Sequence, residues 1–188
     1  LKGLFDENIS YNIQAQQLLN LIRETLNPNE IYVPTFTYKF TKTNYFDVRS
    51  TSSEVGRFSE EIRELFKDKK NRTLDPVFSV IETEKNLFQT KKINREAFGP
   101  SSIWKYLNDN EHYVVNINLK SPIVATQLHY IEYLCNVPYR YEKKFTGTLK
   151  DWFADENPIE YDYFVRDLEL NPTWNRAKIL ETSRSHKS

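Results

Sequence analysis

The chain has 188 residues, and its 26 cationic and 26 anionic side chains cancel to a formal net charge of zero. A hydrophobic share of 39% and an aromatic share of 14% exclude a disordered chain and suffice for a globular domain with a core. Because zero net charge gives no electrostatic basis for binding a polyanion, we expect no nucleic-acid partner.

The single cysteine, Cys135, excludes an intrachain disulfide and favours a reducing, cytoplasmic location. No apolar run of about 18 residues predicts a transmembrane helix and no signal peptide is visible, so no membrane partner is expected. The chain contains no methionine and begins with Leu1, from which we expect a missing N-terminal segment. A sheet edge left open by a missing strand would favour a homodimer, or pairing with the missing half.

Helices and strands are predicted in turn along the chain. The first is a helix over residues 11–26, with Ser10 as its cap and apolar residues at helical spacing. Residues 30–40, rich in β-branched and aromatic side chains, predict a strand that breaks at Pro34. The remaining predicted elements are a helix over 59–68, a turn and strand over 72–83, a turn and helix over 98–109, a buried strand over 111–119, a helix from Thr126, a strand or arm over 137–147, and a short helix with a polar tail over 171–188.

Helices interleaved with strands favour an α/β fold, specifically a three-layer α/β/α sandwich that forms one domain over residues 1–188. The last residues, 180–188, are expected to be a mobile tail. Functional sites in such folds gather at the carboxyl ends of strands and the helix starts that follow them. His129 would lie near that edge of the sheet.

The segment TQLHYIEY, residues 126–133, places His129 and Glu132 three residues apart. With Thr126 as the helix cap, the two side chains would be neighbours on one helix face. The carboxylate would raise the pKa of the imidazole and the helix N-terminus would lower it, which together would keep a neutral, oriented ring. One interpretation is a general base, and the other is a surface pair or a structural histidine.

Other chemistries are less well supported by the sequence. On a helix that turns by roughly 100° per residue, Cys135 points away from His129, so we expect a core thiol rather than a nucleophile. A metal would need a third ligand from His112 or a remote carboxylate, and no spacing indicates one, so no metal is expected. The sequence also lacks the G-x-S-x-G turn of α/β hydrolases.

Six segments carry a resemblance to a known family, and they are VPTFTY (33–38), TSSEVGRFSEEIR (51–63), RTLDPVFSV (72–80), FGPSS (98–102), TQLHYIEY (126–133) and VPYRYEKKFTG (137–147). In this order they resemble the aminoglycoside 3-N-acetyltransferase family, whose members transfer acetyl from acetyl-CoA to a sugar amine. The last segment is similar to the arm of members encoded with surface-polysaccharide genes. The resemblance implies an α/β/α fold, acetyl-CoA as co-substrate, and His129 as a base supported by Glu132.

The resemblance also implies contacts with both substrates, and the residues it assigns to acetyl-CoA are Thr35, Ser53, Arg72 and Ser79. Arg72 would contact a CoA phosphate, with a structural ion pair as the alternative. Asp47 and Asp75 would attract a cationic sugar, and both could equally be turn residues. Asp75 stands where many drug-modifying members of the family have histidine. Arg140 and Lys143 would meet the phosphates of a nucleotide-linked acceptor.

These features predict direct acetyl transfer onto the amine of an amino sugar, in surface-polysaccharide biosynthesis. The balanced composition offers no excess of acid to attract a polycationic drug. An aminoglycoside acceptor, with antibiotic resistance as its consequence, stays open as an alternative. So does a different class of protein, an inactive remnant of a split gene that acts as a binding module.

Overall fold

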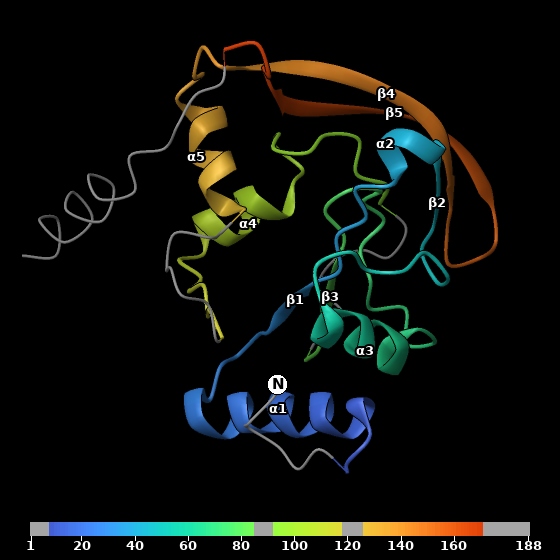
Figure 1. The fold of residues 1–188 in the computed structure, drawn as a ribbon, viewed down its shortest axis with the longest axis vertical. Helices are drawn as coiled ribbons and strands as arrows, with labels where there is room; N and C mark the ends of the chain where they lie inside the picture. The colour runs from blue at the N-terminus through green and yellow to red at the C-terminus, as the bar shows by residue number, and fades with distance from the viewer. Residues whose placement is uncertain (1–7, 85–91, 118–125, 171–188) are drawn as a thin grey trace, which may run out of the picture. The chain divides into compact units, whose positions relative to one another are not determined.

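The computed structural model describes residues 8–84, 92–117 and 126–170, in which helices and strands alternate at first and are followed by two successive helices and two successive strands (Figure 1). The helices are α1 (Tyr11–Leu26), α2 (Phe40–Thr43), α3 (Arg57–Phe66), α4 (Ile103–Asp109) and α5 (Gln127–Leu134). The strands are β1 (Tyr32–Pro34), β2 (Tyr45–Asp47), β3 (Val80–Glu82), β4 (Arg140–Lys150) and β5 (Glu156–Arg166). This mixture agrees with the predicted α/β class.

The described strands form one sheet of two strands and one of three. In the smaller sheet β1 pairs antiparallel with β3, and Val33 lies opposite Ile81. In the larger sheet β4 lies between β2 and β5, and β2 runs parallel to β4 with Phe46 opposite Leu149. The three-layer α/β/α arrangement stays a prediction.

The contacts within the chain divide it into two compact units, which are described separately. The first unit comprises residues 1–95 and 145–161, and the second comprises residues 96–144 and 162–188. Two of the three boundaries fall within strands, because β4 and β5 each begin in one unit and end in the other. The single domain expected from the sequence stays a prediction, and the expected tail at 180–188 lies outside the described residues.

The first unit has a core between α1, α3 and the smaller sheet. Its members are buried apolar side chains, namely Ala15, Leu19, Val33, Ile62, Phe66 and Ile81. The helix predicted over residues 11–26 is confirmed with those bounds, and it ends at Asn27, which is left-handed with φ of 44°. The predicted side-chain cap is wrong, because the Ser10 hydroxyl donates to the Asn12 side chain instead of accepting from the helix.

The second unit contains α4, α5 and a group of packed aromatic rings. The Phe98 ring lies 6.3 Å from that of Trp104 and 6.3 Å from that of Tyr133, measured between centroids. These contacts hold the loop before α4 against α5, with aromatic burial supplying the stabilisation. Across the described parts of both units, no helix combines the length and apolar character needed to cross a bilayer.

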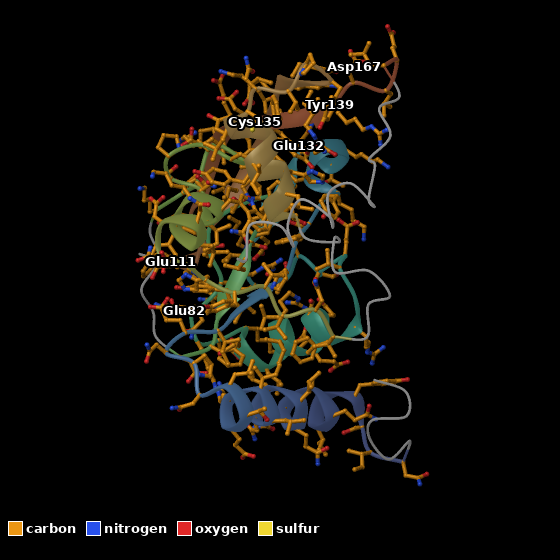
Figure 2. All side chains as sticks on the ribbon, turned by 90° about the vertical axis from the view of Figure 1, so that its left-hand side faces the viewer. Glu82, Glu111, Glu132, Cys135, Tyr139 and Asp167 are labelled. Atoms are coloured by element: carbon orange, nitrogen blue, oxygen red, sulfur yellow. The ribbon has the colours of Figure 1, made fainter. Side chains whose placement is uncertain are left out.

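Two sequence-based expectations in the second unit are wrong. Residues 111–117 form no strand, and Tyr113 is 95% exposed, so the apolar run does not enter a core in the described residues. The rest of that predicted strand, residues 118–119, lies outside the described residues. Cys135 is exposed rather than buried, because α5 ends at Leu134 and leaves the thiol on the cap residue (Figure 2).

Candidate active site

The second unit brings together the two side chains whose spacing predicts a contact. Nδ1 of His129 lies 2.6 Å from Oε2 of Glu132, one helical turn along α5. The imidazole side chain keeps 30% of its surface exposed, whereas the Glu132 side chain keeps 9%. Thr126 has helical backbone angles and does not cap the helix with its hydroxyl, which differs from the prediction. The ring can therefore be reached from solvent while the acid that orients it is buried.

The Glu132 carboxylate receives donors from beyond its own helix. The Tyr139 hydroxyl donates to Oε1 at 2.9 Å, and Nε of Arg140 lies 2.8 Å from Oε2. Together with the contact from His129, both carboxylate oxygens are engaged. A buried carboxylate needs such partners, since an unpaired charge would be costly at this depth.

The Arg140 side chain is itself 9% exposed and is turned inward. Its Nη1 donates to the Phe164 carbonyl at 3.1 Å, and its Nη2 lies 2.9 Å from Nδ1 of His129. All three guanidinium nitrogens thus face groups of the second unit, among them Glu132. The geometry supports a place for Arg140 in this network rather than the predicted contact with acceptor phosphates.

The protonation states of the pair follow from these contacts. Burial, and after it the charge of Arg140, lowers the pKa of His129, while the Glu132 contact opposes them. Burial alone would raise the pKa of Glu132, but hydrogen bonds from His129 and Tyr139 and the charge of Arg140 lower it overall. At neutral pH the imidazole is therefore neutral and the carboxylate ionised. The lowered pKa agrees with the expected neutral ring, and its causes are burial and the charge of Arg140.

The shorter of the two contacts at Nδ1 of His129 favours one tautomer of the ring. An ionised carboxylate has only lone pairs, so its approach to 2.6 Å favours a hydrogen on Nδ1, although Nη2 of Arg140 lies 2.9 Å from the same atom. Nδ1 then donates to Glu132 and cannot accept from Arg140, whose Nη2 acts on the ring as a nearby charge. The lone pair of the neutral imidazole is left on Nε2, which is the atom able to take a proton.

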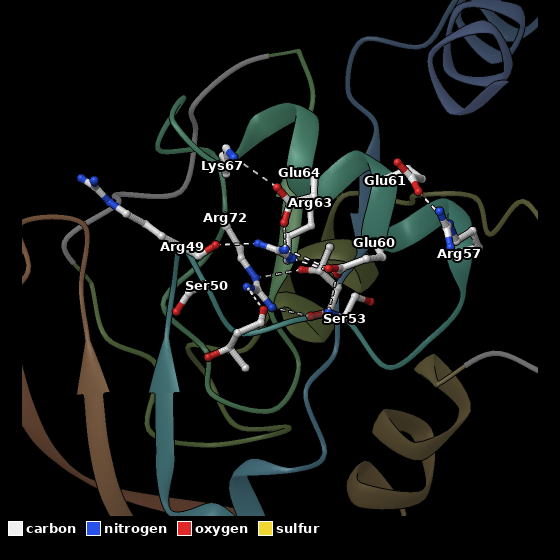
Figure 3. Close-up of polar contacts among 12 residues, drawn as sticks. Arg49, Ser50, Ser53, Arg57, Glu60, Glu61, Arg63, Glu64, Lys67 and Arg72 are labelled. Atoms are coloured by element: carbon white, nitrogen blue, oxygen red, sulfur yellow. Dashed lines mark hydrogen bonds and ion pairs between the residues drawn. The ribbon is translucent and has the colours of Figure 1, made fainter. Parts of the chain in front are cut away.

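The first unit contains the four residues to which the resemblance assigns acetyl-CoA contacts. Arg72 is 2% exposed, and Figure 3 shows its guanidinium surrounded by groups of the chain. Its nitrogens donate to the carbonyls of Thr35 at 2.9 Å, Val48 at 3.1 Å and Thr51 at 2.6 Å. Burial, and after it the charge of Arg63, lowers the pKa of Arg72 to about 9, so the group stays charged at neutral pH.

The other three residues of this set differ in exposure. Thr35 and Ser79 are fully buried, and the Ser79 hydroxyl donates to the Thr35 carbonyl at 2.7 Å. The Thr35 N–H, a candidate oxyanion donor, instead donates to the Ser79 carbonyl at 2.9 Å. Ser53 is half-buried, and its N–H donates to Glu60 at 2.7 Å (Figure 3). Buried donors that are already engaged do not fit a CoA phosphate, so the geometry supports a scaffolding role and the CoA contacts stay predictions.

The two aspartates assigned to the acceptor both close turns in the first unit. Asp47 accepts from the N–H groups of Arg49 at 2.9 Å and Ser50 at 3.3 Å. Asp75 is buried and accepts from the N–H groups of Val77 at 2.9 Å and Phe78 at 2.7 Å. Burial raises the pKa of Asp75, which is the opposite of what a cation-attracting carboxylate needs. The geometry supports the turn alternative for both, and their contact with an acceptor stays a prediction.

Metal ligation has no structural support in the described ranges, where no three potential ligands from histidine, cysteine, aspartate and glutamate gather. The arrangement of a partly exposed imidazole beside a buried carboxylate resembles the histidine and acid of catalytic triads.

Sequence reasoning did not single out Tyr139. Helical spacing predicts contacts only between residues of the same helix, and Tyr139 lies beyond the end of α5. It reaches Glu132 because the chain turns at Asn136, which has φ of 45°. A signal was nevertheless present, because an asparagine followed by Val-Pro is a typical way to leave a helix, and Tyr139 is the first polar side chain after it.

Comparison with known proteins gives one family-level result. The family model described as aminoglycoside 3-N-acetyltransferase matches residues 11–172, which cover most of the chain. The matched range includes His129, Glu132, Tyr139 and Arg140. No curated protein and no solved structure matches the chain significantly.

Proposed function

This chain belongs to the aminoglycoside 3-N-acetyltransferase family, and from that premise we propose that it transfers the acetyl group of acetyl-CoA to the amine of an amino sugar. The observation that carries the proposal is the contact of 2.6 Å between Nδ1 of His129 and Oε2 of Glu132, on a ring with 30% of its surface exposed. This geometry supports a general base with a supporting acid.

The proposed reaction is direct transfer between two bound substrates. The neutral amine attacks the thioester carbonyl, and its nitrogen gives up a proton to Nε2 of His129 as the C–N bond forms. The carboxylate of Glu132 stabilises the imidazolium that results. Collapse of the tetrahedral intermediate breaks the C–S bond, and the imidazolium returns the proton to the departing sulfur. The products are an amide and the free thiol of CoA.

The proposal also has to specify which class of amino sugar accepts the acetyl group. An aminoglycoside agrees with the description of the family, whereas a surface-polysaccharide intermediate rests on the arm at residues 137–147. A nucleotide-linked acceptor would draw on Arg140, but that guanidinium is engaged with Glu132, His129 and Phe164. We therefore place aminoglycosides first among the amino sugars to be tested.

The first prediction concerns turnover. The protein should release CoA thiol from acetyl-CoA in the presence of an aminoglycoside or another amino sugar, followed with a thiol-reactive dye. Replacing the base, His129→Ala, should lower kcat/KM by about 10³-fold, within the range that general-base catalysis contributes. Cys135→Ala, at the opposite end of α5, is the control, and it should keep nearly normal turnover because its exposed thiol lies outside the network.

Two outcomes would count against the proposal. Unchanged turnover in His129→Ala would remove the base assignment. A complete absence of thiol release over a panel of aminoglycosides, monomeric amino sugars and nucleotide-linked amino sugars would favour the binding-module alternative. Binding of those sugars without turnover, measured by calorimetry, would identify which ligand such a module holds.

A further inference from the structure

We propose that Arg140 and Tyr139 are positioning residues that lock Glu132 against Nδ1 of His129 and thereby present Nε2 as the atom that takes the proton. The inference rests on the proposed function in taking His129 as the base, and it assigns Arg140 to the catalytic pair instead of to acceptor phosphates. Four observations of the second unit carry it.

The first observation is the convergence of donors on one carboxylate. Oε2 of Glu132 lies 2.6 Å from Nδ1 of His129 and 2.8 Å from Nε of Arg140, and Oε1 accepts from the Tyr139 hydroxyl at 2.9 Å. A glutamate has several rotatable bonds, and a helix alone does not select one orientation. Tyr139 engages Oε1, and Arg140 lies against both Oε2 and Nδ1 of His129, so together they restrict the carboxylate to the orientation that contacts the ring.

The second observation is that the holding residues are themselves braced. Nη1 of Arg140 donates to the Phe164 carbonyl of β5 at 3.1 Å. The Tyr139 carbonyl accepts from the Asp167 N–H at 2.9 Å. These two contacts tie residues 139–140 to the end of β5, so the donors reach Glu132 from a hydrogen-bonded backbone rather than from a free arm.

The third observation is the placement of charge around the ring. The charged groups in contact with His129, among the described residues, are Glu132 from α5 and Arg140 from β4, while Tyr139 contributes a neutral phenol to Glu132. Nη2 of Arg140 lies 2.9 Å from Nδ1 and 3.5 Å from Nε2. A lone carboxylate at 2.6 Å would favour a permanent imidazolium, which cannot accept a proton. Burial of the ring and, after it, the guanidinium charge offset that attraction and lower the pKa of His129, so the ring is oriented by an acid and remains neutral.

The fourth observation is burial. The side chains of Glu132 and Arg140 are each 9% exposed, whereas that of His129 is 30% exposed. Solvent therefore screens the supporting charges less than it screens the ring, and the two charges act on the imidazole at short range. The same burial keeps an acceptor phosphate from replacing Glu132 as the partner of Arg140.

The experiment separates the charge of Arg140 from its bulk and is made on the full chain. Arg140→Gln removes the cation, Arg140→Lys retains it, and Tyr139→Phe removes one hydrogen bond. The control is Arg166→Gln, which deletes an exposed cation from the end of β5. The His129 ring is followed by NMR over a pH series, and its signal is assigned by its loss in His129→Ala, since the chain has three histidines.

In the unmodified protein, ¹⁵N shifts should show the proton on Nδ1 of the neutral His129 ring. In Arg140→Gln the midpoint of the His129 titration should rise by about one pH unit, while Arg140→Lys and Arg166→Gln should leave it nearly unchanged. In a plot of kcat/KM against pH, the fall in activity on the acidic side should shift to higher pH by the same amount. The reason is that a base with a higher pKa is already protonated at a higher pH. Tyr139→Phe should lower kcat about tenfold without moving that limb.

An unshifted His129 titration in Arg140→Gln would overturn the inference, whatever the activity of the variant. So would a proton found on Nε2 in the unmodified protein, a measurement that needs no variant and remains decisive if Arg140→Gln fails to fold. A shifted titration in a protein that releases no CoA thiol would leave the inference standing and would reject the proposed function instead.

Discussion

At the scale of single residues, the first unit shows how one buried cation can organise a loop. Arg72 donates to carbonyls of Thr35, Val48 and Thr51, which lie on segments far apart in the sequence from Arg72 itself. Its guanidinium also lies over the Phe46 ring, with Cζ 5.0 Å from the centroid. The planar fork of an arginine suits several acceptors at once, which a lysine cannot match.

We therefore predict that Arg72→Met lowers the free energy of unfolding by at least about 3 kcal/mol, because the carbonyls are left without donors inside the fold. Arg72→Lys should recover little of this loss, since one ammonium cannot reach all of these acceptors. Urea denaturation followed by circular dichroism measures both. A small change in stability together with a raised KM for acetyl-CoA would instead support the predicted contact with a CoA phosphate.

At the scale of elements, the packing of α1 against α3 and the smaller sheet shows how burial distinguishes residues within one helix. Leu19 is 2% exposed and belongs to the core of the first unit, whereas Leu21 on the same helix is 47% exposed. The two side chains have equal helix propensity, so a difference between their variants reports packing alone.

Leu19→Ala should lower the free energy of unfolding by about 3 kcal/mol, from lost transfer energy and from the cavity left behind. Leu21→Ala is the matched control and should change it by less than about 0.5 kcal/mol. Thermal unfolding of both variants under one buffer condition makes the comparison. Equal losses would mean that α1 packs through a different face.

At the scale of the whole molecule, the balanced charge has a consequence for solubility. The formal net charge is zero and the sequence isoelectric point is about 7.0, so repulsion between molecules is weakest near neutral pH. Its net charge gives no overall attraction for a polycation, so we expect recognition of an acceptor to depend on local contacts.

We predict a solubility minimum near pH 7, measured by precipitation with polyethylene glycol, with higher solubility about 1.5 pH units to either side. Lys42 is an exposed residue of α2, and Lys42→Glu replaces a positive with a negative charge. The substitution lowers the isoelectric point, so the solubility minimum should move to lower pH. A minimum that stays in place in this variant would show that a patch, not net charge, controls association.

The sequence by itself determined what depends on neighbours along the chain. Helix periodicity predicted α1, and the three-residue spacing predicted that His129 and Glu132 would touch on α5, because side chains at that separation share a helix face. The ordered motifs indicated the family, which the family model over residues 11–172 confirms.

Only the tertiary structure decided what depends on segments brought together by folding. The burial of Arg72 and the hydrogen bond from Arg140 to the Phe164 carbonyl follow from long-range contacts, whereas the reach of Tyr139 to Glu132 follows from the turn at Asn136, which helix periodicity does not predict. The apolar run at residues 111–117 failed as a strand for the same reason, since alternation predicts a strand only where a partner completes its hydrogen bonds. Chain-local spacing could place an acid beside a histidine, but the burial and the charge of Arg140 that lower the pKa of that histidine depend on how the second unit folds.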